Sequence, residues 1–128
     1  MARKRKPTRP RFVQLFEWEM NLPAYRHLSC YARCLIMEFR RKYTGRNNGD
    51  IGMSCREAAR LLGCAPDTAS KALRELEEKG WIRCEEKGYF TKKDKVATKW
   101  RITSHAVGLG VDMGETREYK HWKPTDEN

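Results

Sequence analysis

The sequence predicts one α+β domain, mainly α, in which a three-helix core carries a two- to three-stranded β-hairpin. Apolar residues recur with the 3.6-residue period of amphipathic helices in segments before Gly80, and with the two-residue period of strands after it. The chain has 128 residues, of which 39% are apolar. That length supports one hydrophobic core and is too short for a two-domain enzyme.

The first helix is predicted to begin after Ser29, because serine is a favourable N-cap residue. It ends at residues 44–50, TGRNNGD, where glycine and asparagine tolerate a left-handed backbone and form turns. Its apolar face comprises Ala32, Leu35, Ile36, Phe39 and Tyr43.

A short edge strand and a second helix follow. Ile51 and Met53 alternate with glycine and predict a single short strand. The sequence SCRE, starting at Ser54, matches a capping box in which the Glu57 side chain reaches back to the helix N-terminus. Gly63 is placed to end this helix as a left-handed cap. Its predicted buried stripe comprises Cys55, Ala58, Ala59 and Leu62.

The third helix starts three residues after the second one ends. Pro66 suits a first helical position, where its missing N–H would be unpaired anyway. The buried stripe is predicted to be Ala69, Ala72, Leu73 and Leu76, and the helix ends at Gly80. Small alanines on facing stripes and a tight turn predict a steep crossing, the helix-turn-helix arrangement. The outward arc of the third helix comprises Asp67, Ser70, Lys71, Arg74 and Glu78, with Thr68 at its edge.

Two strands follow Gly80 and predict a hairpin with a basic loop at residues 86–95. The first alternates Trp81, Arg83 and Glu85 against Ile82 and Cys84, and the second places Val96, Thr98, Trp100 and Ile102 on one side. The loop carries Lys87, Lys92, Lys93 and Lys95 around Tyr89 and Phe90. Such a loop can lie along a duplex backbone or probe a minor groove.

The predicted organisation is a basic disordered arm at 1–11, a domain at 12–104 and a partly packed C-terminal tail at 105–128.

The formal net charge is +10, and the positive charge is concentrated in two places. One is the N-terminal arm and the other is the late hairpin, where seven bases face three acids within residues 81–103. A charge run can be a solubilising surface, but clusters of Lys and Arg also supply affinity for a polyanion by releasing its counterions. The bases of the arm are Arg3, Lys4, Arg5, Lys6, Arg9 and Arg11.

Residues 53–84, MSCREAARLLGCAPDTASKALRELEEKGWIRC, resemble the winged helix-turn-helix module of bacterial regulators of the GntR and MarR kind. The wider stretches FVQLFEWEMNLPAYRHLS, RRKYTGRNNGDIGMS and VATKWRIT resemble small helix-turn-helix proteins of proteobacterial phages and integrated elements. The resemblance covers roughly residues 12–123 and implies a β-hairpin wing and DNA binding. One departure is an acidic last turn of the third helix, with Glu75, Glu77 and Glu78, which leaves its N-terminal half for groove entry.

The function predicted is sequence-selective binding of double-stranded DNA, in a phage or mobile-element transcriptional regulator. Helix 66–79 is expected in the major groove and wing 86–95 on the backbone. The predicted DNA-binding residues are Thr68, Ser70, Lys71, Arg74, Lys87, Lys92, Lys93, Lys95, Arg3, Lys4, Arg5 and Lys6. The alternative is a phage-encoded protein-interaction module that engages a replication factor or inhibits a host protein such as a CRISPR effector. A second copy of the chain, in a homodimer, is a further expected partner.

The sequence gives only weak signals for a metal site or a catalytic site, and we expect no enzyme activity, cofactor or metal. Cys30 and Cys34, with His27, have the spacing of partial zinc ligands, but no CxxC pair supports them. No serine or cysteine nucleophile motif and no glycine-rich phosphate loop is present.

Five cysteines without paired spacing, no long apolar run and no signal sequence predict a cytoplasmic protein without a membrane partner. The cysteines Cys55, Cys64 and Cys84 are expected to pack as small hydrophobes. Aromatic residues Phe12, Phe16 and Trp18 are expected to complete the core, or alternatively to stack on nucleobases.

Overall fold

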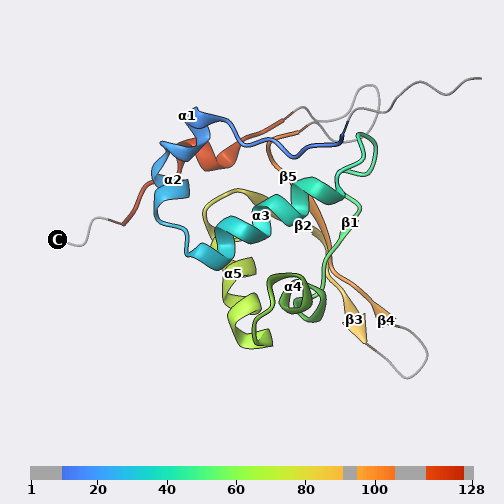
Figure 1. The fold of residues 1–128 in the computed structure, drawn as a ribbon. Helices are drawn as coiled ribbons and strands as arrows, with labels where there is room; N and C mark the ends of the chain where they lie inside the picture. The colour runs from blue at the N-terminus through green and yellow to red at the C-terminus, as the bar shows by residue number, and fades with distance from the viewer. Residues whose placement is uncertain (1–9, 91–94, 106–114, 126–128) are drawn as a thin grey trace, which may run out of the picture.

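The computed structural model describes residues 10–90, 95–105 and 115–125 (Figure 1). Three main helices, α3 (Cys30–Lys42), α4 (Cys55–Leu62) and α5 (Pro66–Glu78), pack against one another. A three-stranded antiparallel sheet completes the domain. The predicted class, α+β and mainly helical, is confirmed. Within the described residues, no helix is long and apolar enough to cross a membrane.

Side-chain caps start α3 and α4 where the sequence predicts them. The Ser29 hydroxyl accepts a hydrogen bond from the Ala32 amide at 3.1 Å, and that of Ser54 accepts from the Glu57 amide at 3.0 Å. The reciprocal half of the predicted capping box is replaced, because the Glu57 carboxylate binds the Lys42 ammonium at 2.6 Å. This ion pair ties the start of α4 to the end of α3.

The turn between α4 and α5 has the predicted chemistry. Gly63 ends α4 in the left-handed region with φ 68°, and Pro66 opens α5. The predicted stripe of α5 is buried, as are Ala58 and Ala59 of α4. The predicted burial of Cys55 is wrong: it is exposed, because it is the first residue of a two-turn helix and lies beyond the alanine contact.

The sheet has the strand order β1-β5-β2, all antiparallel, formed by β1 (Ile51–Gly52), β5 (Lys99–Ile102) and β2 (Ile82–Glu86). Register pairs Ile51 with Trp100 and Ile82 with Ile102, which places these apolar residues over the helices. A separate two-stranded ladder, β3 (Tyr89–Phe90) with β4 (Lys95–Val96), extends the hairpin away from the core (Figure 1).

Cys84 departs from the prediction that it packs as a small hydrophobe, because it is exposed on β2. The ladder between β2 and β5 shifts register between Cys84 and Glu86, so the strict alternation of the sequence fails at this end of the strand. Cys64, in the turn between α4 and α5, is half-buried and packs against the core as predicted.

Three short helices close the far side of the core: α1 (Glu17–Met20), α2 (Pro23–Arg26) and the 3-10 helix η1 (Glu118–His121). Tyr119 of η1 is fully buried and its ring stacks on Trp81 at a centroid distance of 4.0 Å. The segment before α1 was predicted to complete the core, but Phe12, Phe16 and Trp18 are 79%, 44% and 37% exposed. Tyr119 fills the place against Trp81 instead.

Candidate nucleic-acid interface

One end of the molecule gathers α4, α5 and the β3–β4 hairpin, while η1, α1 and the segment leading into α1 lie at the opposite end (Figure 1). The outward arc predicted for α5 is solvent-facing in the structure. Lys71 and Arg74 are exposed, and Thr68 and Ser70 are half-buried. Asp67 and Glu78 are exposed at the two ends of the same arc.

Exposed bases at this end carry charge that is not neutralised within the domain. Lys71 and Arg74 of α5, Arg56 of α4 and Lys87 beyond β2 are exposed, and none forms an ion pair with another described residue. Arg60 lies one turn after Arg56, with its guanidinium 3.9 Å from the Glu57 carboxylate. The sequence prediction missed Arg56 and Arg60, although two bases four residues apart on the helix before the 63–65 turn are a detectable signal.

Several bases elsewhere in the domain form ion pairs with acidic side chains. Four of these contacts join Lys42 to Glu57 at 2.6 Å, Lys99 to Asp50 at 2.9 Å, Arg101 to Glu85 at 2.9 Å and Arg83 to Glu118 at 3.1 Å. These pairs lie mainly along the sheet and its edges. Which bases stay exposed without an ion-pair partner among the described residues therefore depends on the fold, which the net charge of the chain does not reveal.

The N-terminus of α5 adds backbone donors to this surface. Its N-cap is Ala65, which has no side-chain oxygen, so no side-chain bond caps the first turn. The first amides of a helix lack intrahelical acceptors, and the helix dipole makes this end positive. Asp67 in the first turn partly offsets that charge. The first turn can therefore donate to phosphate or base-edge oxygens in a groove.

The acidic last turn of α5 has a structural role that the sequence prediction missed. The Glu75 carboxylate accepts hydrogen bonds from both the backbone N–H and the hydroxyl of Ser29, each at 2.8 Å. Glu75 is thereby turned toward α3, and only Glu77 and Glu78 remain near the surface. The bond also holds the α5 axis relative to α3, which sets the angle at which α5 presents its exposed arc.

Six predicted DNA-binding residues lie outside the described residues, and for a seventh only the backbone is described. Lys95 belongs to β4 and pairs with Phe90. The six are Arg3, Lys4, Arg5, Lys6, Lys92 and Lys93. The first described residues, 10–16, lie at the end of the molecule away from α5 (Figure 1).

A buried charged cluster organises the opposite end. The Glu19 carboxylate accepts from Arg40 Nη1 at 3.0 Å and Nη2 at 2.7 Å, and from the Tyr119 hydroxyl at 2.7 Å. Burial alone would raise the pKa of Glu19, but the hydrogen bonds from Arg40 and Tyr119 outweigh it and hold the pKa below 4.5. Burial, together with the bond to Glu19, raises the pKa of Tyr119 well above its usual range. Thus Arg40 stays ion-paired to a carboxylate inside the protein at neutral pH.

Metal ligation finds no support in the geometry of the described chain. No group of three or more His, Cys, Asp or Glu side chains there is close enough to hold an ion. His27, which the sequence placed beside Cys30 and Cys34, instead lies against the Trp122 ring at 5.5 Å and its Nδ1 contacts the Pro23 carbonyl at 3.0 Å. Comparison with protein-family models, curated proteins and solved structures found no match for the chain.

Proposed function

We propose that the chain is a winged helix-turn-helix protein that binds double-stranded DNA sequence-selectively, as a transcriptional regulator of a phage or mobile element. The observation that carries the proposal is the set of exposed bases on α4 and α5 that form no ion pair with another described residue. Lys71, Arg74 and Arg56 share the end of the molecule from which the β3–β4 hairpin extends. A duplex backbone is the polyanion that a helix flanked by a hairpin can engage with both elements at once.

The α5 residues divide into base-reading and phosphate-binding positions. Thr68, Ser70 and Lys71 lie in the first turn and a half of α5, where side chains and helix dipole approach a major groove first. Arg74 lies one turn later and suits a phosphate. Arg56, on the preceding helix, is assigned to the flanking backbone, as the first helix of such a pair crosses it.

The hairpin lysines and the N-terminal arm supply affinity for DNA that does not depend on the DNA sequence. Lys87 is exposed at the base of the hairpin, and the proposal places Lys92, Lys93 and Lys95 on the backbone further along it. The proposal also assigns Arg3, Lys4, Arg5 and Lys6, which lie outside the described residues, to the duplex backbone. Losing such contacts weakens all DNA binding, since each phosphate contact contributes through counterion release.

The test begins by sequencing DNA that the full chain retains from fragmented genomic DNA. Binding isotherms are then measured for the retained site and for a scrambled duplex at one salt concentration. Ser70→Ala or Lys71→Ala should lower the ratio of specific to non-specific affinity by about 1–3 kcal/mol. Lys87→Ala and Arg56→Ala should weaken both duplexes together, and each should flatten the plot of log affinity against log salt by about 0.9.

The matched control is Lys120→Ala, because Lys120 is exposed on η1 at the end away from α5. This variant also loses one positive charge, and its isotherms should match those of the parent. If Lys120→Ala weakens binding as much as Lys71→Ala, net charge and not the α4–α5 surface determines affinity. That result would refute the assignment of the interface.

A protein-interaction module is the second candidate function, and one observation favours it. Phe12, Phe16, Trp18 and Met20 are large apolar residues that remain exposed on one short segment at the end away from α5. Exposed apolar groups gathered in this way are typical of protein interfaces, including those of homodimers. If the α5 variants leave DNA binding unchanged while a Phe16→Ser variant loses a protein partner from phage or host, this candidate replaces the first.

A further inference from the structure

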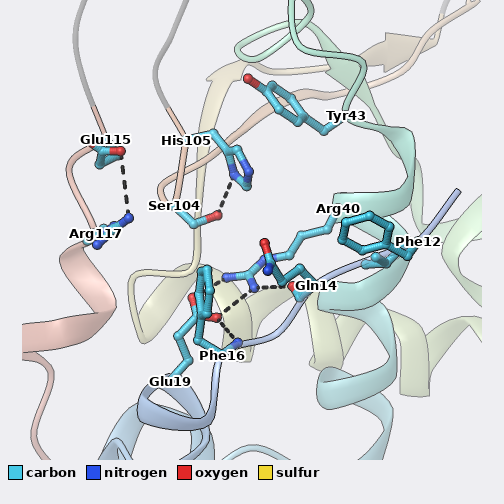
Figure 2. Close-up of a pocket in the computed structure, with 11 residues that line it drawn as sticks. Phe12, Gln14, Phe16, Glu19, Arg40, Tyr43, Ser104, His105, Glu115 and Arg117 are labelled. Carbon is cyan, nitrogen blue, oxygen red and sulfur yellow. Dashed lines mark hydrogen bonds and ion pairs between the residues drawn. The ribbon is translucent and has the colours of Figure 1, made fainter.

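A cavity of about 380 Å³ lies at the end of the domain away from α5, where three separate parts of the chain meet (Figure 2). Its walls include Phe12 and Phe16 from the N-terminal segment, Arg40 and Tyr43 from the end of α3, and His105 and Arg117 from segments after β5. Its volume falls in the range of small-molecule sites, and its lining mixes aromatic rings with a few polar groups, as in such sites.

Two guanidinium groups that line this cavity have hydrogen-bonding capacity left over. Arg40 donates from Nη1 to Glu19 and to the Gln14 carbonyl, and from Nη2 to Glu19, but its Nε is buried without a partner among the described residues. The Arg40 side chain is only 5% exposed. Nε of Arg117 is likewise buried and without a described partner. A buried N–H without an acceptor is destabilising, so an oxygen that a small side-chain shift brings within reach would stabilise either group.

Arg117 is also held in an unusual backbone conformation. Among the described residues it is the one non-glycine residue with positive φ, at φ 45° and ψ 49°. Long side chains rarely adopt this left-handed region, and residues held in it cluster at binding sites. Glycine would relieve the strain, so the presence of arginine here indicates a role for the guanidinium, which also lies 5.4 Å from the Trp18 ring.

The charge around the cavity favours a singly charged anion. Arg40 is compensated by Glu19 at 2.7 Å, whereas the carboxylate paired with Arg117 among the described residues is that of Glu115, at 3.7 Å. Arg11 and Arg41 line an adjoining hollow and add positive potential, but they do not line the cavity itself. The hollow shares Phe12, Arg40 and Tyr43 with the cavity.

The imidazole of His105 in this lining is neutral at pH 7. Burial, helped by the Arg40 charge, lowers the pKa of His105, and its Nδ1 lies 2.8 Å from the Ser104 hydroxyl. The imidazole ring packs on Tyr43 at a centroid distance of 4.4 Å, which extends the aromatic wall. The site therefore combines aromatic walls with two guanidinium groups, a neutral imidazole and the carboxylates of Glu19 and Glu115.

We infer that this cavity binds a small aromatic carboxylate, with the carboxylate at the Arg40 and Arg117 guanidinium groups and the ring between Phe12, Phe16 and Tyr43. A doubly charged phosphate is a poorer match, because Glu19 and Glu115 already face the two arginines. The inference stands apart from DNA binding, since the cavity lies at the opposite end from α5.

Sodium benzoate is the probe, and the arginine Nε–H resonances of the isotope-labelled full chain are the readout by two-dimensional NMR. Saturable shifts of the Arg40 and Arg117 Nε–H signals are expected, with a dissociation constant of about 1 mM or lower. Benzamide has the same shape without the charge and should bind at least about tenfold more weakly, because charge-assisted hydrogen bonds are lost. Inorganic phosphate should leave both signals in place.

Two variants test the residues. Arg117→Gly suits the left-handed backbone and removes the guanidinium, and Phe12→Ala removes a wall residue that is 79% exposed and not needed for folding. Each should weaken benzoate binding by about tenfold, while Lys120→Ala, which also removes a cation near Trp18, should not change it. Absence of a saturable shift, equal binding of benzamide or phosphate, or unchanged binding by both variants would each overturn the inference.

Discussion

Replacing Glu19 by glutamine should destabilise the domain strongly although the two side chains have nearly the same shape. The Glu19 side chain is 2% exposed and that of Arg40 is 5% exposed. Glu19 accepts from Arg40 twice, from the Tyr119 hydroxyl at 2.7 Å and from the Phe16 amide at 2.9 Å. Glutamine removes the charge and places an amide donor among these donors, so Arg40 remains buried without a counter-charge.

Breaking a buried ion pair by removing one partner costs about 3–5 kcal/mol, and we expect Glu19→Gln to fall in this range. Tyr119→Phe removes one hydrogen bond to a charged group and should cost about 1.5–3 kcal/mol. Glu38→Gln is the matched control, because Glu38 pairs with Arg41 at 3.5 Å and the Arg41 side chain is 71% exposed. It should change stability by less than about 1 kcal/mol.

Urea unfolding followed by circular dichroism at several pH values measures these differences. The pKa of Glu19 is below 4.5 in the folded chain, so its carboxylate contributes its full stabilisation above the unfolded value and loses it as pH falls through the folded value. The difference in unfolding free energy between parent and Glu19→Gln should therefore be constant near neutral pH and narrow as the pH falls below the usual range of a glutamate pKa. A Glu19→Gln protein as stable as Glu38→Gln at neutral pH would show that the cluster does not stabilise the fold.

Two further pairs of substitutions test the packing. Gly80→Ala should cost about 3 kcal/mol or more, because Gly80 has φ +87° and a Cβ there would lie 2.8 Å from backbone atoms of residues 118–119. A Cβ at Gly63 meets open space, so Gly63→Ala should cost only the left-handed penalty of about 1–2 kcal/mol. Equal melting temperatures for the two variants would contradict this. Leu73→Ala should cost about 2–5 kcal/mol because Leu73 is buried on α5, while Lys71→Ala, exposed on the same helix, should leave the melting temperature nearly unchanged. Equal losses for that pair would mean that the faces of α5 are assigned wrongly.

Local sequence signals predicted the three main helices because their start and stop groups lie next to one another in the chain. Ser29, Ser54 and Pro66 open the helices and Gly63 closes α4, as predicted. Each of these signals acts within about one helical turn, so neighbouring residues suffice to find it. The buried face of α5 followed from spacing alone for the same reason.

The candidate site was predicted in part. The exposed arc of α5 could be read from helical periodicity, since periodicity separates the buried side from the exposed one. Arg56 and Arg60 were missed, although their spacing of four residues on the predicted second helix was a detectable signal. The role of Glu75 was missed because its partner, Ser29, lies 46 residues earlier in the chain.

By itself, the sequence determined the three helices, the change to strands after Gly80, the excess of positive charge and the outward arc of α5, all of which depend on residues within a few positions of one another. The tertiary structure alone decided which bases are neutralised, because Lys42, Lys99 and Arg101 meet acids that are distant in sequence. It also decided the Glu19–Arg40–Tyr119 cluster and the cavity beside it, whose residues span a hundred positions of the chain. The periodicity of apolar residues cannot reveal such contacts, because the energy of a buried charge depends on where the rest of the chain places its partner.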